Sequence, residues 1–144
     1  MGGGGRGARA AQPAGDRGHL AATEDTFWDR TPTDQRAGTL SEIVAGARDR
    51  LGADVPEHAL EAAALAYLEA WAPHIEHDTE AATTLRALRA AGIRVAMLSN
   101  THWPRDYHER FLARDGLADL IDARIYTSEL AYMKPHPSAF AAAL

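Results

Sequence analysis

Two groups of polar residues in this sequence have the types and the spacing needed to bind an anion. The first is Ser99-Asn100-Thr101, which directly follows the apolar run of residues 93–98. A hydroxyl group and free backbone N–H groups, placed where a strand passes into a helix, form a natural site for a negatively charged ligand. The second is Lys134, whose ammonium is a compact point charge suited to phosphate and is held in a loop stiffened by two nearby prolines.

Each group also has an ordinary structural explanation. Ser-Asn-Thr after a strand is common in turns and helix caps, and a lysine beside prolines is often part of an exposed loop. Together they are more specific, because about 35 residues containing a helix and a strand separate them. If the two strands are neighbours in one parallel sheet, we expect the hydroxyl of Ser99 and the ammonium of Lys134 to face a common cavity at its edge.

The second half of the chain alternates between helix and strand patterns. A short apolar run rich in Val and Ile predicts a strand at residues 93–98, buried on both faces. A helix opened near Pro104 and a second strand at residues 123–127 follow, and the three elements make a right-handed βαβ unit. A helix from Asp78 to about residue 91 comes before this unit, and a last helix begins at Pro137.

The first half predicts a small helical unit over residues 25–72. Thr39 and Glu42 match a capping box, and the apolar spacing after them indicates a helix that a glycine ends. A second helical pattern runs over residues 54–72. Residues 21–38 are polar, and we expect no more than a short turn of helix there.

Composition excludes several classes of function. The 144 residues suffice for about one domain, and a net charge of −5 gives no basic field for nucleic acid or anionic lipid. The absence of cysteine excludes disulfides and thiol catalysis. No apolar run reaches the roughly 18 residues of a membrane-spanning helix, so we expect a cytoplasmic protein. Residues 1–20 are rich in Gly, Ala and Arg and are expected to form a disordered tail.

Histidines add two further candidates. His74, Glu76 and His77 are metal-ligand types, but they lie on a predicted connector with no fixed face, which favours a solvated loop over a metal site. His102 follows the anion loop, where contact with a substrate is one alternative. Trp103 is expected to be a hydrophobic plug at the start of the next helix.

In this order, the two motifs resemble those of the haloacid dehalogenase-like (HAD) hydrolase superfamily, in its phosphatase-type branch with a helical cap. The apolar strand ending in Ser-Asn-Thr resembles the second motif of that family. The third is resembled by Tyr-Thr-Ser-Glu at residues 126–129, followed by Met-Lys-Pro-His-Pro-Ser-Ala-Phe at residues 133–140, which contains Lys134. The resemblance implies an α/β fold with a partial HAD-like, Rossmann-like parallel sheet and a small helical cap. Its parts would be a tail (1–20), a helical cap-like region (21–77) and a partial core (78–144).

The resemblance also implies a phosphatase mechanism on a small phosphorylated substrate. An aspartate attacks phosphorus and forms an aspartyl phosphate, with Mg²⁺ as the cofactor. By position, Ser99 would hydrogen-bond a phosphoryl oxygen, and the backbone around Asn100 and Thr101 would do likewise. Lys134 would neutralise charge on the nucleophile and on the transferred group. Ser99 and Lys134 are thus the expected catalytic residues.

The family's Asp-x-Asp nucleophile motif is absent from this sequence, and its terminal acidic motif would lie beyond Leu144. We therefore expect an incomplete copy with negligible turnover alone and no identifiable metal ligands. The alternatives are a non-catalytic phosphate-binding or interaction module that kept the anion loop, and an inactive gene fragment. An exposed sheet edge would also allow a homodimer.

Overall fold

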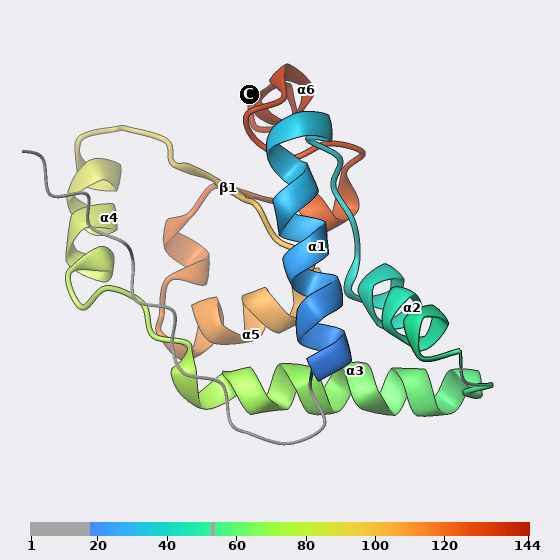
Figure 1. Cartoon of the computed structure of the whole chain (residues 1–144). Coiled ribbons are helices and arrows are strands. Elements are labelled where there is room, and N and C mark those ends of the chain that lie inside the picture. The colour runs from blue at the N-terminus through green and yellow to red at the C-terminus, as the bar shows by residue number, and fades with distance from the viewer. Residues whose placement is uncertain (1–17, 53) are drawn as a thin grey trace, which may run out of the picture.

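The computed structural model describes residues 18–52 and 54–144, which fold into helices around one short parallel sheet. Figure 1 shows α1, α2 and α3 on one side of the molecule and α4 on the other, with α5 between them. In chain order the elements are α1 (Gly18–Asp34), α2 (Leu40–Leu51), α3 (Glu57–Trp71), α4 (Ala81–Ala90), β1 (Ala96–Ser99), α5 (Arg105–Arg114), β2 (Ala123–Tyr126) and α6 (Pro137–Ala141), with short 3-10 turns at Ala72–His74, Ala118–Leu120 and Thr127–Glu129. Most of the predicted tail lies outside the described residues, and residues 18–20 already belong to α1.

Helix α1 is longer than its sequence indicated. It spans 17 residues and carries Pro32 near its end, where only a short turn was predicted. Its polar sequence gives a weak periodic signal, so tertiary packing accounts for its length. Phe27 is buried against Ile43 of α2 and Met133 of the loop after β2.

Helices α2 and α3 form as the sequence predicted. Thr39 Oγ1 accepts from the Glu42 backbone N–H at 3.3 Å, and Glu42 Oε2 accepts from the Thr39 backbone N–H at 2.7 Å, which completes the capping box. Gly52 ends α2 in the left-handed region, at φ 60°. Both helices pack on α5 through one buried cluster, which consists of Leu40, Val44, Leu68, Tyr107 and Phe111.

The two strands pair in parallel and are joined by α5, which confirms the βαβ unit. The register runs from Ala96 opposite Ala123 to Ser99 opposite Tyr126. The prediction of a first strand buried on both faces is wrong, because β1 begins at Ala96 and its residues are exposed or half-buried. Ile93, which precedes it, is 50% exposed. In the described part of the chain β1 pairs only with β2, so its other edge has no covering strand.

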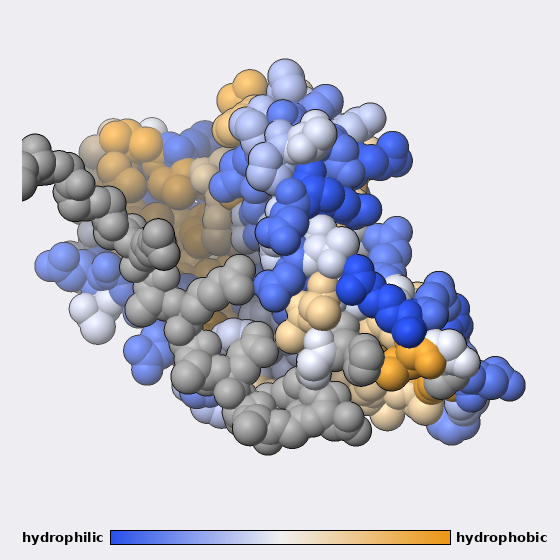
Figure 2. All heavy atoms as spheres, in the orientation of Figure 1, coloured by the Kyte–Doolittle hydropathy of each residue, from blue (hydrophilic) through white to orange (hydrophobic). Residues whose placement is uncertain are grey.

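Apolar side chains are also exposed at the surface between α2 and α3. A groove of about 430 Å³ is lined there by Val44, Leu51 and Leu60 among others. Figure 2 shows an apolar patch where these two helices lie close together. Among the described residues, no helix has both the length and the apolar character to cross a membrane.

Candidate active site

The strand end that carries Ser99 and the ammonium of Lys134 lie at one edge of the sheet. Ser99 is the last residue of β1 and is half-buried. Lys134 Nζ donates a hydrogen bond of 2.7 Å to the backbone carbonyl of Leu98, the residue before Ser99. A positive charge therefore lies directly beside the carboxyl end of β1, although 36 residues separate Lys134 from Leu98 along the chain.

Asn100 fixes the loop that carries this lysine. Its side-chain amide donates to the Lys134 carbonyl at 3.0 Å, and its side-chain oxygen accepts from the Lys134 backbone N–H at 2.9 Å. This reciprocal pair joins the loops that follow the two strands. Sequence analysis assigned only the backbone around Asn100 to ligand binding and missed this positioning role of the side chain.

The loop of Lys134 is also held from the side of α1 and α2. The Met133 backbone N–H donates to the Gln35 carbonyl at 2.9 Å, and the Ala37 N–H donates to the Ala131 carbonyl at 3.1 Å. Met133 is fully buried, in the cluster that contains Phe27. The position of the ammonium thus depends on contacts from both halves of the chain.

Thr101 lies inside the molecule, and its polar groups have internal partners. Its backbone N–H donates to Thr127 Oγ1 at 2.9 Å, and the same hydroxyl donates to the Thr101 carbonyl at 3.1 Å. Its own hydroxyl accepts from the Trp103 N–H at 3.0 Å and lies 2.9 Å from His108 Nε2. A contact of Thr101 with substrate stays a prediction. Thr127, fully buried just after β2, thus positions the loop that follows β1, a role that the sequence analysis did not assign to it.

His102 is buried among aromatic rings at the junction of α1, α3 and the loop after β1. Only 3% of it is exposed, and within the described chain neither ring nitrogen has a hydrogen-bond partner. Burial lowers the pKa of His102 to about 4, with a further contribution from the neighbouring His108. The imidazole is therefore neutral at pH 7, and its 3.4 Å contact with a Glu24 carboxylate oxygen is not a salt bridge there. The surrounding rings are those of Phe27, Trp28, Tyr67 and Trp103.

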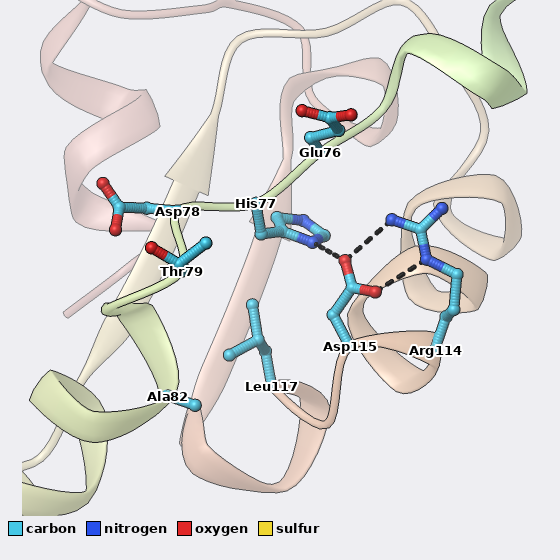
Figure 3. Close-up of a pocket in the computed structure, with 8 residues that line it drawn as sticks. All are labelled: Glu76, His77, Asp78, Thr79, Ala82, Arg114, Asp115 and Leu117. Carbon is cyan, nitrogen blue, oxygen red and sulfur yellow. Dashed lines mark hydrogen bonds and ion pairs between the residues drawn. The ribbon is translucent and has the colours of Figure 1, made fainter.

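A second polar cluster lies on the segment between α3 and α4. His77 Nδ1 is 2.6 Å from Asp115 Oδ2, and Arg114 donates to both oxygens of the same carboxylate, at 2.7 and 2.8 Å. The Arg114 guanidinium, aided by His77, holds the pKa of Asp115 well below its usual range. Figure 3 shows these contacts and shows the carboxylates of Glu76 and Asp78 lying apart from the His77–Asp115 pair. The segment is therefore tied to the end of α5.

A comparison with models of protein families matches residues 6–144 to the haloacid dehalogenase-like hydrolases. The chain belongs to this HAD-like hydrolase family. The expected fold class, a partial HAD-like α/β structure with a parallel sheet, is confirmed by the two parallel strands and by the similar solved structures. The boundary between a cap at 21–77 and a core at 78–144 stays a prediction.

Solved structures of L-2-haloacid dehalogenase from Xanthobacter autotrophicus are similar to this HAD-like chain. One of them contains chloropropionic acid bound covalently. Each of two such structures has a TM-score of 0.51 and 25% sequence identity, and the match covers 86% of this chain and 48% of the dehalogenase chain. The present chain thus spans about half the length of these dehalogenases. A search among curated proteins finds no match.

The side chains of this HAD-like chain do not gather into a metal site within the described ranges. No group of three or more His, Cys, Asp or Glu residues there is placed to hold an ion. His74, Glu76 and His77 do not form such a group either. The groups that the structure places at the edge of the sheet are the Lys134 ammonium and the end of β1.

Proposed function

We propose that this HAD-like hydrolase binds the anionic group of a small substrate at the sheet edge formed by Ser99, Asn100 and Lys134, and that the site is of the phosphatase type. The contact between Lys134 Nζ and the Leu98 carbonyl carries the proposal, since it holds a cation beside Ser99. Lys134 is also the only lysine in the chain. Phosphoryl transfer depends mainly on positioning and on electrostatic stabilisation, which such an arrangement supplies.

In this proposal the three residues have different roles. The Ser99 hydroxyl donates a hydrogen bond to a phosphoryl oxygen, and the Lys134 ammonium offsets the negative charge on the transferred group. Asn100 keeps Lys134 in place through its two side-chain hydrogen bonds, which measure 2.9 and 3.0 Å. Thr101 supports the site from inside the molecule, through its backbone hydrogen bonds with the Thr127 hydroxyl.

A second candidate is dehalogenation of a small 2-halo acid. Its support is the likeness to L-2-haloacid dehalogenase at 25% identity. The carboxylate of a halo acid is an anion, and the same hydroxyl and ammonium would bind it. Phosphate and 2-chloropropionate therefore compete for one site under both candidates, and their relative affinities separate the two.

Binding is expected without turnover. The sequence contains no Asp-x-Asp nucleophile motif, so we expect negligible hydrolysis of p-nitrophenyl phosphate in the presence of Mg²⁺. Mg²⁺ belongs to the phosphatase proposal as the cofactor that the family resemblance implies. We also propose that the substrate is a small molecule, since a net charge of −5 disfavours nucleic acid. The proposed compartment is the cytoplasm.

Calorimetric titration with inorganic phosphate, vanadate and 2-chloropropionate tests the proposal. Tighter binding of the phosphorus and vanadium oxyanions supports the phosphatase type, and tighter binding of the halo acid supports the dehalogenase. Lys134→Met should weaken either by at least tenfold, because a hydrogen bond to a charged group contributes about 1.5–3 kcal/mol. The matched control is Ser138→Ala, because Ser138 is exposed and its hydroxyl contacts the half-buried His136. Binding that is unchanged in Lys134→Met would overturn both candidates.

A further inference from the structure

A polar cavity lies between α1 and α2, beside the loop that joins them. Its volume is about 410 Å³, within the range of small-molecule sites. Thr26 and Arg30 of α1, Arg36 of the joining loop and Glu42 of α2 are among the residues that line it. The cavity is distinct from the anion site at the sheet edge, because Ser99 and Lys134 do not line it.

Three arginines reach this cavity. Arg30 and Arg36 line it directly, and Arg50 Nη2 donates a hydrogen bond of 2.8 Å to the hydroxyl of Thr26. Thr26 and Arg30 are four residues apart on one face of α1, so Arg50 is held on the same side of the cavity as Arg30. All three arginines are exposed, and their guanidinium groups are therefore accessible to a ligand.

These guanidinium groups lack close acidic partners. Within the described ranges, neither Arg36 nor Arg50 has a carboxylate oxygen within 4.0 Å, and Arg30 has only that of Asp34, at 3.9 Å. The other arginine–carboxylate pairs of the described residues measure 2.7–3.3 Å. Three such arginines around one cavity make a local positive region, which attracts anions although the whole chain has a net charge of −5.

Aromatic rings orient two of the three arginines. The guanidinium carbon of Arg30 lies 4.9 Å from the centre of the Phe27 ring, and that of Arg36 lies 5.9 Å from the centre of the Tyr132 ring. Phe27 is buried, so the ring under Arg30 is fixed. An oriented guanidinium loses less freedom when it binds, and its planar fork can hold a carboxylate by two parallel hydrogen bonds.

The two carboxylates nearest to these arginines are already bound to the backbone. Glu42 Oε2 accepts from the Thr39 N–H at 2.7 Å, and Asp34 Oδ1 accepts from the Arg36 N–H at 2.9 Å. These N–H groups offset part of the negative charge, and both contacts hold the loop between α1 and α2 in place. The guanidinium groups are thus left to pair with an anion from outside the chain.

We propose that this cavity binds a small organic dianion, with two carboxylates on a short body. Arg36 binds one carboxylate from the side of the loop. Arg30 and Arg50 bind the other from the side of α1 and α2, next to Thr26. A single small ion would occupy only part of about 410 Å³ and could not bridge both sides, whereas two linked carboxylates can.

Three matched probes test the class of ligand on the full chain. Succinate, succinamate and succinamide share one carbon skeleton and carry two, one and no carboxylates. Binding is followed at constant ionic strength by the Nε–Hε signals of the arginines and by backbone amide shifts around the cavity. We expect saturable shifts with succinate, roughly fivefold weaker binding of succinamate and no binding of succinamide. Equal affinities for succinate and succinamate, or the absence of saturable shifts with succinate, would overturn the proposal.

Three variants and one further control locate the binding. Arg30→Gln and Arg36→Gln should each weaken succinate binding roughly fivefold, because each removes one exposed ion pair with the ligand. Arg86→Gln removes the same charge from the exposed surface of α4 and should leave the affinity unchanged. An equal loss in Arg86→Gln, or no loss in either cavity variant, would refute the site. Lys134→Met should leave the succinate shifts at the cavity unchanged even if it removes phosphate binding, so the two proposals can fail separately.

Discussion

Replacing Asn100 by alanine should destabilise the protein and release the loop that carries Lys134. The substitution removes the hydrogen bonds of 3.0 and 2.9 Å that join the side chain to the Lys134 backbone. Each contributes about 0.5–1.5 kcal/mol net, so we expect a loss of about 2 kcal/mol in the free energy of unfolding. For a chain of this size that corresponds to a fall of about 4–8 °C in Tm.

Chemical unfolding followed by tryptophan fluorescence measures the loss, and NMR of ¹³C-lysine-labelled protein reports on the ammonium. Because Lys134 is the only lysine, its Cε gives a single signal, which should move in Asn100→Ala. Thr127→Val is the matched control, since it removes the buried pair between Thr127 and Thr101 and leaves the lysine loop intact. It should lower stability without moving the lysine signal. A change below 0.5 kcal/mol in Asn100→Ala, or an unmoved lysine signal, would refute the reasoning.

Three further outcomes follow from the packing. The pKa of about 4 for His102 lies below that of a histidine in the unfolded chain. The free energy of unfolding should therefore fall by roughly 3 kcal/mol as the pH drops from about 6.5 to 4. His102→Phe should flatten this part of the pH dependence of unfolding. Gly38→Ala should cost about 1–3 kcal/mol in a denaturant titration, because the added Cβ would come within 2.6 Å of a Phe27 ring carbon. Tyr107→Phe should cost about 1–2 kcal/mol by the same assay, since it leaves the buried Leu68 carbonyl without its donor. A change in the free energy of unfolding below 0.5 kcal/mol in Gly38→Ala or in Tyr107→Phe would contradict the contact that the substitution is meant to disturb.

Local signals in the sequence were sufficient for the helices with clear caps and for the strand–helix–strand unit. Thr39, Glu42 and Gly52 define the ends of α2 as the pattern indicated, because capping depends on neighbouring residues alone. The parallel pairing of the two strands followed from the crossover helix between them. From that pairing the sequence also predicted that Ser99 and Lys134 would meet at one edge.

Features that depend on distant packing were not predictable in this way. Helix α1 is stabilised by contacts of Phe27 with Ile43 and Met133, which no local periodicity reports. The apolar run before Ser99 indicated a fully covered strand, but coverage depends on neighbouring strands rather than on the run itself. The Asn100 amide and the Lys134 backbone come together only through the folded loops, so a sequence pattern shows neither partner.

The most direct test of the anion site is a phosphate titration of ¹³C-lysine-labelled protein, with and without Ser99→Ala. We predict a saturable shift of the single Lys134 signal in the unmodified chain and at least tenfold weaker binding in Ser99→Ala, since a hydrogen bond to a charged oxygen contributes about 1.5–3 kcal/mol. A lysine signal that does not respond to phosphate, or one that responds equally in both proteins, would contradict a shared site for Ser99 and Lys134.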